Sequence, residues 1–283
     1  MLFRAALLGL AALGATAAGL QPRDPTKHCG VAAKREPPAL EELVDERRSV
    51  GLEKSEVLNI DVDVYFHIVA ASEDEDDGYI SDETLKKQLD VLNTDYSSAG
   101  FTFHHRGTDR KVSESWAMDG DEMAMKRELR RGSYRDLNIY YLTRPANDTL
   151  GYSTYPLINV EPDSDDFWED GCVILAGTVP GGKQEGYDLG RTTTHEVGHW
   201  LGLFHTFMGG CEEPGDHVHD TPPQKEATQG CPATAPNSCP DSPGRDGIHN
   251  FMDYSYDSCM EEFTDGQISR MRMLWTTIRG IQN

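Results

Sequence analysis

The sequence predicts a domain that combines helices with strands, continues through a long irregular segment and ends in a helix. Between residues 57 and 176, stretches with the two-residue period of strands alternate with stretches of helical period. Residues 208–247 show neither period and are rich in Pro, Gly and Cys. Residues 264–278 regain the helical period, with Thr264 and Gln267 placed to form a capping box. The 283-residue chain is long enough for one substantial domain with its own core.

The N-terminal residues have the pattern of a secretory signal peptide. After Arg4 comes an apolar run, rich in Ala, Leu and Gly, that ends in small residues such as Ala18. We therefore expect residues 1–18 to be removed and the mature protein to be secreted and extracellular. Residues 19–56 are polar and contain several prolines. They indicate an N-terminal extension or a pro-segment ahead of the main domain at 57–283.

The expected elements of the main domain follow one another at short intervals. Alternating apolar residues predict a half-buried strand over 57–69, and Ser81 is placed to cap a helix over 81–98. The next elements that we expect are a strand at 101–105, a helix at 122–131, and strands at 137–142 and 172–176. A glycine-rich loop at 177–190 then leads into the stretch that carries the chemistry.

Three histidines follow this loop with the spacing His-Glu-x-x-His-x-x-Gly-x-x-His. His195 and His199 are four residues apart, so on a helix they share a face and can hold one metal ion together. Gly202 can adopt a positive φ, which would end the helix and return His205 as a third ligand. Three protein nitrogens leave one position open for water, as is typical of a catalytic zinc site. The alternative is a buried helix whose histidines only form hydrogen bonds.

Three further side chains fit the chemistry of such a site. Glu196 is placed to act as general base toward a zinc-bound water and to pass the proton to a leaving amine. Tyr254 could donate its hydroxyl to the oxyanion of a tetrahedral intermediate. Met252 would pack beneath the histidines as soft apolar filler. The alternatives are a surface carboxylate, a surface tyrosine and an ordinary core methionine.

The extended histidine pattern with a later methionine turn is the signature of the metzincins. The chain resembles a metzincin of the pappalysin type and, more narrowly, the secreted extracellular metalloproteases of fungi. The similarity covers roughly residues 58–283 and is strongest at 190–194 with the helix that follows, at 216–222 and around Met252. It implies an α+β fold, with a twisted, mainly parallel sheet and the active-site helix above a cleft. Below the cleft it implies an irregular, disulfide-tied half that ends in a helix.

The resemblance also implies an activity and a set of site residues. It implies a zinc endopeptidase that holds one Zn²⁺ on His195, His199 and His205 and uses Glu196 as the base. Asp257 matches a carboxylate in the pocket for the residue after the scissile bond, which would favour Arg or Lys there. The alternative for Asp257 is an ordinary turn residue.

Other residues of the lower half match a calcium site and two disulfides of the family. Asp216 and Thr221 match ligands of a calcium-binding turn in some relatives, and oxygen donors in a loop suit Ca²⁺. A solvated acidic turn is the alternative, and the neighbouring His217 and His219 add no oxygen ligands. The implied disulfides join Cys211 to Cys239 and Cys231 to Cys259.

Cys29 and Cys172 remain of the six cysteines. They could form a disulfide that ties the extension to the main domain. Alternatively, Cys29 could act as a cysteine switch, whose thiolate fills the open zinc position of a zymogen. Asn147 begins an Asn-Asp-Thr sequon, so we expect N-glycosylation there in a secreted protein.

The net charge of -22 argues against nucleic acid or an anionic membrane surface as a partner. We expect a monomer whose partners are protein or peptide substrates. The alternative function is an inactive secreted binding or adhesion module on the same fold. Such a module would have no need of Glu196, three histidines and Tyr254.

Overall fold

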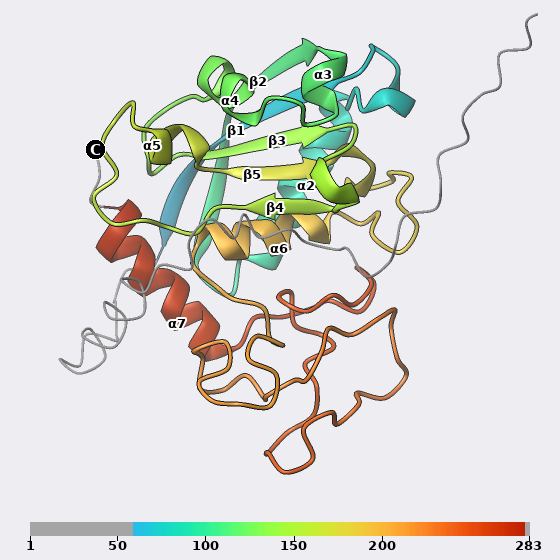
Figure 1. The fold of residues 1–283 in the computed structure, drawn as a ribbon, viewed down its shortest axis with the longest axis vertical. Helices are drawn as coiled ribbons and strands as arrows, with labels where there is room; N and C mark the ends of the chain where they lie inside the picture. The colour runs from blue at the N-terminus through green and yellow to red at the C-terminus, as the bar shows by residue number, and fades with distance from the viewer. Residues whose placement is uncertain (1–58, 281–283) are drawn as a thin grey trace, which may run out of the picture.

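The structure, a computed structural model, describes residues 59–280. The expected signal peptide, the extension at 19–56 and Cys29 lie outside these residues. Figure 1 shows a sheet in the upper part of the molecule, irregular chain in the lower part, and α6 between them. The helix α6 (Arg191–Trp200) carries the first two histidines.

Five strands form one sheet in the order β2-β1-β3-β5-β4. The strands are β1 (Ile60–Ala70), β2 (Phe101–Val112), β3 (Leu137–Leu142), β4 (Gly151–Ser153) and β5 (Cys172–Leu175). The pairs β2–β1, β1–β3 and β3–β5 are parallel, whereas β4 pairs antiparallel with β5. The mainly parallel sheet implied by the resemblance is therefore confirmed. Its antiparallel edge strand, β4, runs beside α6 (Figure 1).

Short helices and turns connect the strands. The α-helices besides α6 are α2 (Asp82–Asp95), α3 (Glu114–Ala117), α4 (Glu122–Leu129), α5 (Asp165–Glu169) and α7 (Asp265–Leu274). Single tight turns are η1 (Glu75–Asp77), η2 (Ala146–Asp148) and η3 (Ala176–Thr178), and a π-turn, η4 (Trp275–Arg279), extends α7. The predicted caps are present: Ser81 accepts the backbone N–H of Thr84, and Thr264 and Gln267 form a capping box.

Helices cover both faces of the sheet. The alternating apolar residues of β1, from Ile60 to Ile68, join one core with residues of α2, α6 and α7. On the opposite face, Val69 packs with Met125 and Leu129 of α4. His67, which alternation placed on the polar face, is fully buried because α4 and its neighbours cover that end of β1. The strand is thus half-buried only over its first residues.

The structure differs from the predicted boundaries in three places. β2 continues to Val112 instead of ending at 105, because a polar edge strand can pair its charges with its neighbour, as Arg106 does with Asp63 at 2.8 Å. The elements β4, α3 and α5 were not predicted, since three to five residues are too few for a period to show. The helices α2 and α4 are shorter than expected by a few residues at their C-terminal ends, whereas α7 continues through the π-turn η4 to Arg279, as the predicted helix at 264–278 requires.

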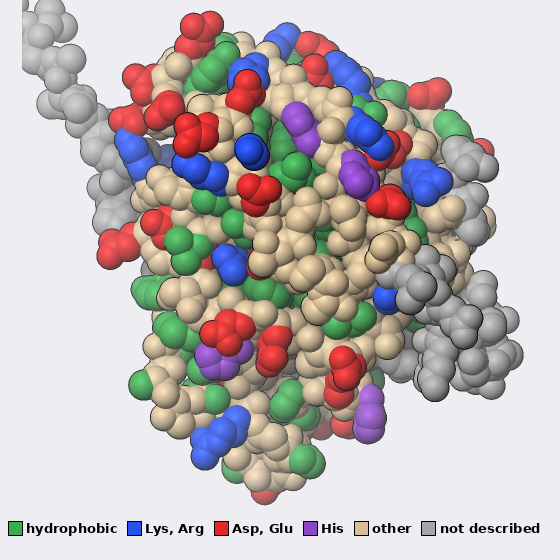
Figure 2. All heavy atoms as spheres, turned by 180° about the vertical axis from the view of Figure 1, so that it is seen from behind, with side chains coloured by type: hydrophobic (Ala, Val, Ile, Leu, Met, Phe, Trp, Pro, Cys, Tyr) green, Lys and Arg blue, Asp and Glu red, His purple; other side chains and the backbone are tan. Residues whose placement is uncertain are grey.

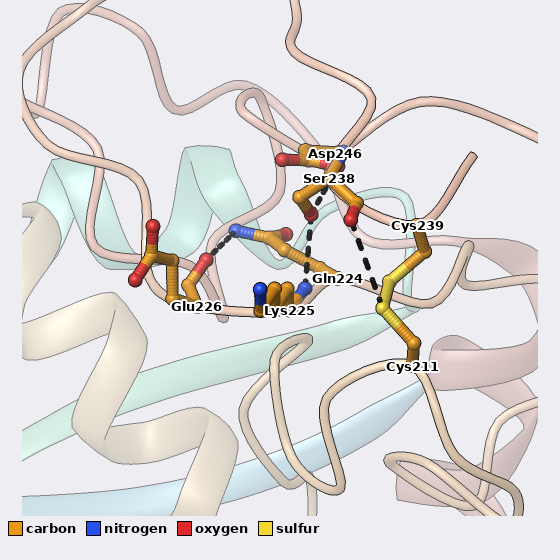
Figure 3. The surroundings of a disulfide bond; sticks show 7 residues. All are labelled: Cys211, Gln224, Lys225, Glu226, Ser238, Cys239 and Asp246. Atoms are coloured by element: carbon orange, nitrogen blue, oxygen red, sulfur yellow. Dashed lines mark hydrogen bonds between the residues drawn. A yellow bond between two sulfur atoms is a disulfide. The ribbon is translucent and has the colours of Figure 1, made fainter.

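The lower half, residues 203–263, is held by side chains and disulfides rather than by ladders of backbone hydrogen bonds. Buried Gln224 donates to the Glu226 carbonyl and to Asp253, and it accepts from Thr206. Disulfides join Cys211 to Cys239 and Cys231 to Cys259, the pairs that the resemblance implies. Figure 3 shows the first disulfide beside Ser238, whose hydroxyl donates to Asp246 and accepts the Lys225 amide.

The surface carries charges of both signs. Figure 2 shows acidic and basic side chains interspersed over the back of the molecule. Among the helices of residues 59–280, each is too short or too polar to cross a lipid bilayer.

Candidate active site

The active-site helix α6 is anchored to α2 at several points. Residues 192–200 are all buried, so the helix lies inside the molecule and not on its surface. Its N-terminal Gly190 has φ of 90° and its carbonyl accepts a hydrogen bond from Gln88 at 3.0 Å. The Tyr96 hydroxyl donates to the Thr194 carbonyl at 2.9 Å, and the Thr194 hydroxyl donates to Asp95 at 2.7 Å. These buried bonds fix the helix against rotation, and hence the direction of its histidines.

The three predicted histidines converge on one point. The Nε2 atom of His199 lies 3.1 Å from Nε2 of His195 and 3.0 Å from Nε2 of His205. The three rings form a buried group whose donor atoms all lie within 4.8 Å of one another. Tetrahedral zinc with Zn–N bonds near 2.05 Å would hold such nitrogens roughly 3.3 Å apart. The spacing of the three nitrogens therefore fits a zinc ion.

Backbone carbonyls orient two of these rings. Nδ1 of His195 donates to the Phe251 carbonyl and Nδ1 of His199 to the Leu203 carbonyl, both at 2.7 Å. With Nδ1 protonated, Nε2 of each ring keeps a lone pair for a metal. Burial lowers the pKa of His199 to about 4 and that of His205 well below its usual value, and the neighbouring histidines lower the latter further. The two Nδ1 hydrogen bonds and the lowered pKa values of His199 and His205 favour neutral imidazoles whose Nε2 atoms can bind a metal.

Two glycines allow this arrangement. Gly202 has φ of 97°, and a Cβ there would lie 2.3 Å from Leu274, so only glycine fits the turn that returns His205. The Arg270 guanidinium holds this turn through the Gly202 carbonyl at 2.8 Å. A Cβ at Gly198 would lie 2.4 Å from the Met252 sulfur. The fully buried Met252 therefore packs directly under the helix, between the turns that carry His195 and His199.

Glu196 is fully buried and lies against the edge strand β4. A Cβ on Gly151 would come within 2.9 Å of Cγ and 3.0 Å of Oε1 of Glu196. Residue 151 must therefore be small for the carboxylate to fit beside His195. The sequence contained Gly151 but no pattern that would have singled it out, because the contact joins segments that are distant in the chain.

Tyr254 lies beside two of the three histidines. Its ring centroid is 5.6 Å from that of His195 and 5.0 Å from that of His205. Phe207, which sequence reasoning did not select, stacks on His205 at 4.7 Å and contacts the Tyr254 ring at 4.9 Å. The Tyr254 ring therefore packs against His195 of α6 and against His205 and Phe207, which follow the helix.

Asp257 lies at the start of α6, across a small cavity from Glu196. One oxygen, Oδ2, accepts the backbone N–H groups of Leu189 at 2.8 Å and Arg191 at 3.2 Å. The other, Oδ1, is buried and accepts no hydrogen bond from residues 59–280. Burial raises the pKa of Asp257 to about 7. The cavity, about 20 Å³ and called here the catalytic pocket, is lined by Leu150, Tyr187, Thr192, His195, Glu196, Asp253, Tyr254, Asp257 and Met260.

The expected calcium turn is ordered by its own hydrogen bonds. Oδ1 of Asp216 accepts the Thr221 hydroxyl at 2.7 Å and the Val218 amide at 3.0 Å. Oδ2 of Asp216 is buried and accepts no hydrogen bond from the described residues. Burial raises the pKa of this carboxyl to about 6. Asp216 and Thr221 are brought together as expected, whereas His217 and His219 add no oxygen atom there.

The remaining predicted residues lie away from the histidines. Cys172 is fully buried in β5, where its sulfur lies 3.3 Å from the Ser153 hydroxyl, and it forms no disulfide with any described residue. Because Cys29 lies outside residues 59–280, the Cys29–Cys172 disulfide and the cysteine switch stay predictions. Asn147 is exposed in η2, as a glycosylated residue must be, and its modification also stays a prediction.

Comparison with known proteins gives a consistent family. The family model described as pregnancy-associated plasma protein-A, a peptidase family, matches residues 181–275. An extracellular metalloprotease of Neurospora crassa is 45% identical over 279 residues, covering 97% of this chain and 95% of its own. Extracellular metalloprotease 1 of Coccidioides posadasii is 53% identical over 220 residues, 78% of each chain.

The chain belongs to the pappalysin family of metallopeptidases. Two solved structures agree with the fold. Promirolysin of Tannerella forsythia, solved as a mutant, aligns with a TM-score of 0.69 at 27% identity and covers 90% of this chain and 95% of its own. Mature mirolysin with a cleaved peptide aligns with a TM-score of 0.63 at 29% identity, covering 77% and 92%. This pappalysin is therefore a metzincin-type metalloprotease, and its relatives' names support an extracellular location.

Proposed function

We propose that this pappalysin is a secreted zinc endopeptidase in which Glu196 activates the attacking water and Asp257 selects a basic residue after the scissile bond. The observation that carries the proposal is the convergence of three Nε2 atoms, 3.0 and 3.1 Å apart, beside a buried glutamate. His195, His199 and His205 would hold the ion. Zinc, when bound, supplies a Lewis acid that lowers the pKa of water and polarises the scissile carbonyl.

The chain's own residues would carry the proton transfers. Glu196 follows the first ligand directly, and the small Gly151 leaves its carboxylate room beside β4. In this position it can take a proton from the attacking water and deliver it to the leaving amine. Tyr254 packs edge-on to His205, so its hydroxyl can donate to the developing oxyanion. No acyl-enzyme is needed.

The basic preference rests on the two oxygens of Asp257. Oδ2 accepts hydrogen bonds from the backbone N–H groups of residues 189 and 191. Buried Oδ1 accepts no hydrogen bond from residues 59–280, and Asp257 lines the catalytic pocket. A guanidinium or ammonium group from the residue after the scissile bond would satisfy Oδ1 through a charge-assisted hydrogen bond. The competing role for Asp257 is to hold the start of α6, which its Oδ2 contacts support by themselves.

Several further assignments complete the proposal. Residues 1–18 direct secretion, residues 19–56 form an extension or pro-segment, and residues 57–283 form the catalytic domain. Asn147 carries a glycan, and the protein is a monomer. Ca²⁺ binds at Asp216, whose Oδ2 atom is buried without a hydrogen-bond partner among residues 59–280.

The test is zinc content measured together with casein hydrolysis, on secreted wild type and on Glu196→Gln. We expect one zinc in each protein and a loss of activity on the order of 10²–10⁴-fold in the variant, because general-base catalysis supplies about that factor. Retained activity in the variant would remove Glu196 as the base. Zinc in both proteins with activity in neither would favour an inactive binding module or a zymogen, and trimming residues 19–56 separates those two.

A further inference from the structure

A second, larger groove lies at the carboxyl ends of the parallel strands. Its volume is about 570 Å³, within the range of sites that bind ligands. Buried Ile80, Leu175 and Val179 contribute apolar surface to it, and Met118, 45% exposed, lies among its lining residues. Exposed charged residues, Glu75, Asp76, Lys183 and Glu185, are also among its lining residues. An apolar base with a charged rim is typical of a surface that receives side chains.

The groove and the catalytic pocket share a wall. Leu150 and Tyr187 line the catalytic pocket, Leu175 lines the groove, and these three side chains form one small buried cluster. The loop after β5 contributes to both cavities, with Tyr187 on the catalytic side and residues 177–185 on the groove side. A polypeptide that leaves the catalytic pocket past Leu150 would therefore reach the groove without crossing another element of the wall.

The direction of β4 sets which part of a substrate would reach the groove. Among residues 59–280, β4 is an edge strand that pairs with β5 alone, and Gly151 at its start touches Glu196. An extended substrate that adds to this edge in the antiparallel sense runs parallel to β5. Its carboxyl-terminal part then points toward the carboxyl end of β5, where Leu175, Ala176 and Gly177 line the groove. The Asp257 side of the catalytic pocket lies toward the same end, through its contact with Leu189.

We propose that this groove binds the leaving-side segment of the substrate, a few residues beyond the scissile bond, and prefers apolar side chains there. The proposal rests on the proposed orientation, in which the residue after the scissile bond enters the Asp257 side of the catalytic pocket. It adds a second specificity element that is independent of the basic preference. The ion pair between Lys183 and Asp76 joins the loop after β5 to η1 beside the groove, but both side chains are mostly exposed. Since exposed pairs stabilise weakly, this bridge can yield to an incoming chain.

The test measures peptide binding by calorimetry in the zinc-loaded Glu196→Gln background, so that no peptide is consumed. Three synthetic peptides begin with Arg: a dipeptide amide, a hexapeptide with Leu and Phe at positions three to five, and the same hexapeptide with Ser there. Burial of two or more apolar side chains predicts that the apolar hexapeptide binds at least about tenfold more tightly than the other two.

Matched variants separate the groove from other causes. Adding Met118→Glu should reduce the difference between the hexapeptides to within twofold, and Met118→Leu should retain it. Val112→Glu changes an equally exposed apolar residue (47%) on the far edge strand β2 and should retain the difference as well. Equal binding of the two hexapeptides, or a difference that survives Met118→Glu, would overturn the proposal. If the wild type fails to cleave casein but the apolar hexapeptide still binds more tightly than the serine hexapeptide, the proposed peptidase activity is wrong and the proposed role of the groove in peptide binding is retained.

Discussion

Above the active-site helix, the chain is ordered by a sheet whose strands satisfy one another's backbone groups and whose two faces are covered by apolar cores. Below it, residues 203–263 have no strand pairing beyond one isolated bridge between Asn250 and Glu262. Here buried side chains such as Gln224 and Asp253 form hydrogen bonds with backbone groups and with each other. Two disulfides hold the loops together.

The active site lies where these two kinds of order meet. His195, Glu196 and His199 come from the helix that is anchored to the sheet side. His205, Met252, Tyr254 and Asp257 come from the lower half, and they reach the helix through the Gly202 turn and the packing of Met252 on Gly198. The geometry of the site therefore depends on both halves. We expect substitutions in the upper half to act through its buried core and substitutions in the lower half to act through its disulfides.

The upper half should be most sensitive at Asp170. This carboxylate is 1% exposed and accepts hydrogen bonds from Arg279 at 2.8 Å and from Arg130 and Trp200 at 3.2 Å. Asp170→Ala leaves two buried guanidinium groups without their partner, so we expect a loss of about 3–5 kcal/mol in the free energy of unfolding. Urea unfolding followed by tryptophan fluorescence measures it. The exposed pair of Asp63 with Arg106 is the control, and Asp63→Ala should cost less than about 1 kcal/mol. A similar cost for both variants would contradict this view of the core.

The lower half should be most sensitive at its disulfides. Cys211 and Cys239 close a loop of 28 residues, and the chain-entropy model assigns such a cross-link roughly 3–4 kcal/mol. In the double variant Cys211→Ser/Cys239→Ser, amides of residues 211–246 should exchange with solvent much faster, whereas amides of β1 and β3 should keep their protection. Hydrogen exchange with mass spectrometry resolves the two regions. Equal loss of protection in both would show that the halves unfold as one unit.

At the junction, Tyr254→Phe removes one hydroxyl and keeps the ring packing against His195 and His205. We expect kcat to fall roughly 10²-fold with little change in KM, because an oxyanion donor acts only in the transition state. Steady-state kinetics on a quenched-fluorescence peptide, with zinc content as the control, measures the effect. An unchanged kcat would remove Tyr254 from the chemistry and leave it a packing role.

A smaller effect is expected at Asp257, where the two roles can be separated. Asp257→Asn keeps an acceptor for the Leu189 and Arg191 amides but removes the charge, whereas Asp257→Ala removes both. We expect the Asn variant to lose about tenfold in kcat/KM for peptides with Arg after the scissile bond, and to change little for peptides with Ala there. Thermal unfolding should separate the variants, with only Ala lowering the melting temperature. If Asn retains the Arg preference, Asp257 only holds the helix start.

The smallest and most gradual effect is a pH dependence. Burial raises the pKa of Asp257 to about 7, so its carboxyl is neutral below that pH and charged above it. The preference for Arg over Ala, as a ratio of kcat/KM values, should therefore rise as the pH increases through about 7, and Asp257→Asn should abolish the rise. The same shift means that the folded state holds this proton more tightly than the unfolded chain does. Its stabilising contribution is thus present below about pH 4 and is lost as the pH rises through about 7.

Local patterns accounted for much of the regular secondary structure. The alternation of β1, the Ser81 cap of α2 and the Thr264–Gln267 capping box depend on near neighbours, and all three are present. The elements β4, α3 and α5 could not be predicted, since they are too short to carry a period. β4 is nevertheless the strand that places Gly151 against Glu196, and Leu150, the residue before it, lines the catalytic pocket.

The sequence by itself determined which residues are proposed to hold the metal, because a helix turn brings His195 and His199 together and a glycine turn returns His205 within a few residues. Only the tertiary structure decided what surrounds them. Segments that are far apart in the chain meet in each of three features. These are the hydrogen bonds from the Leu189 and Arg191 amides to Asp257, the packing of Met252 under Gly198, and the groove beyond Leu175. No local pattern encodes such contacts, because they depend on how the sheet and the irregular half pack against one helix.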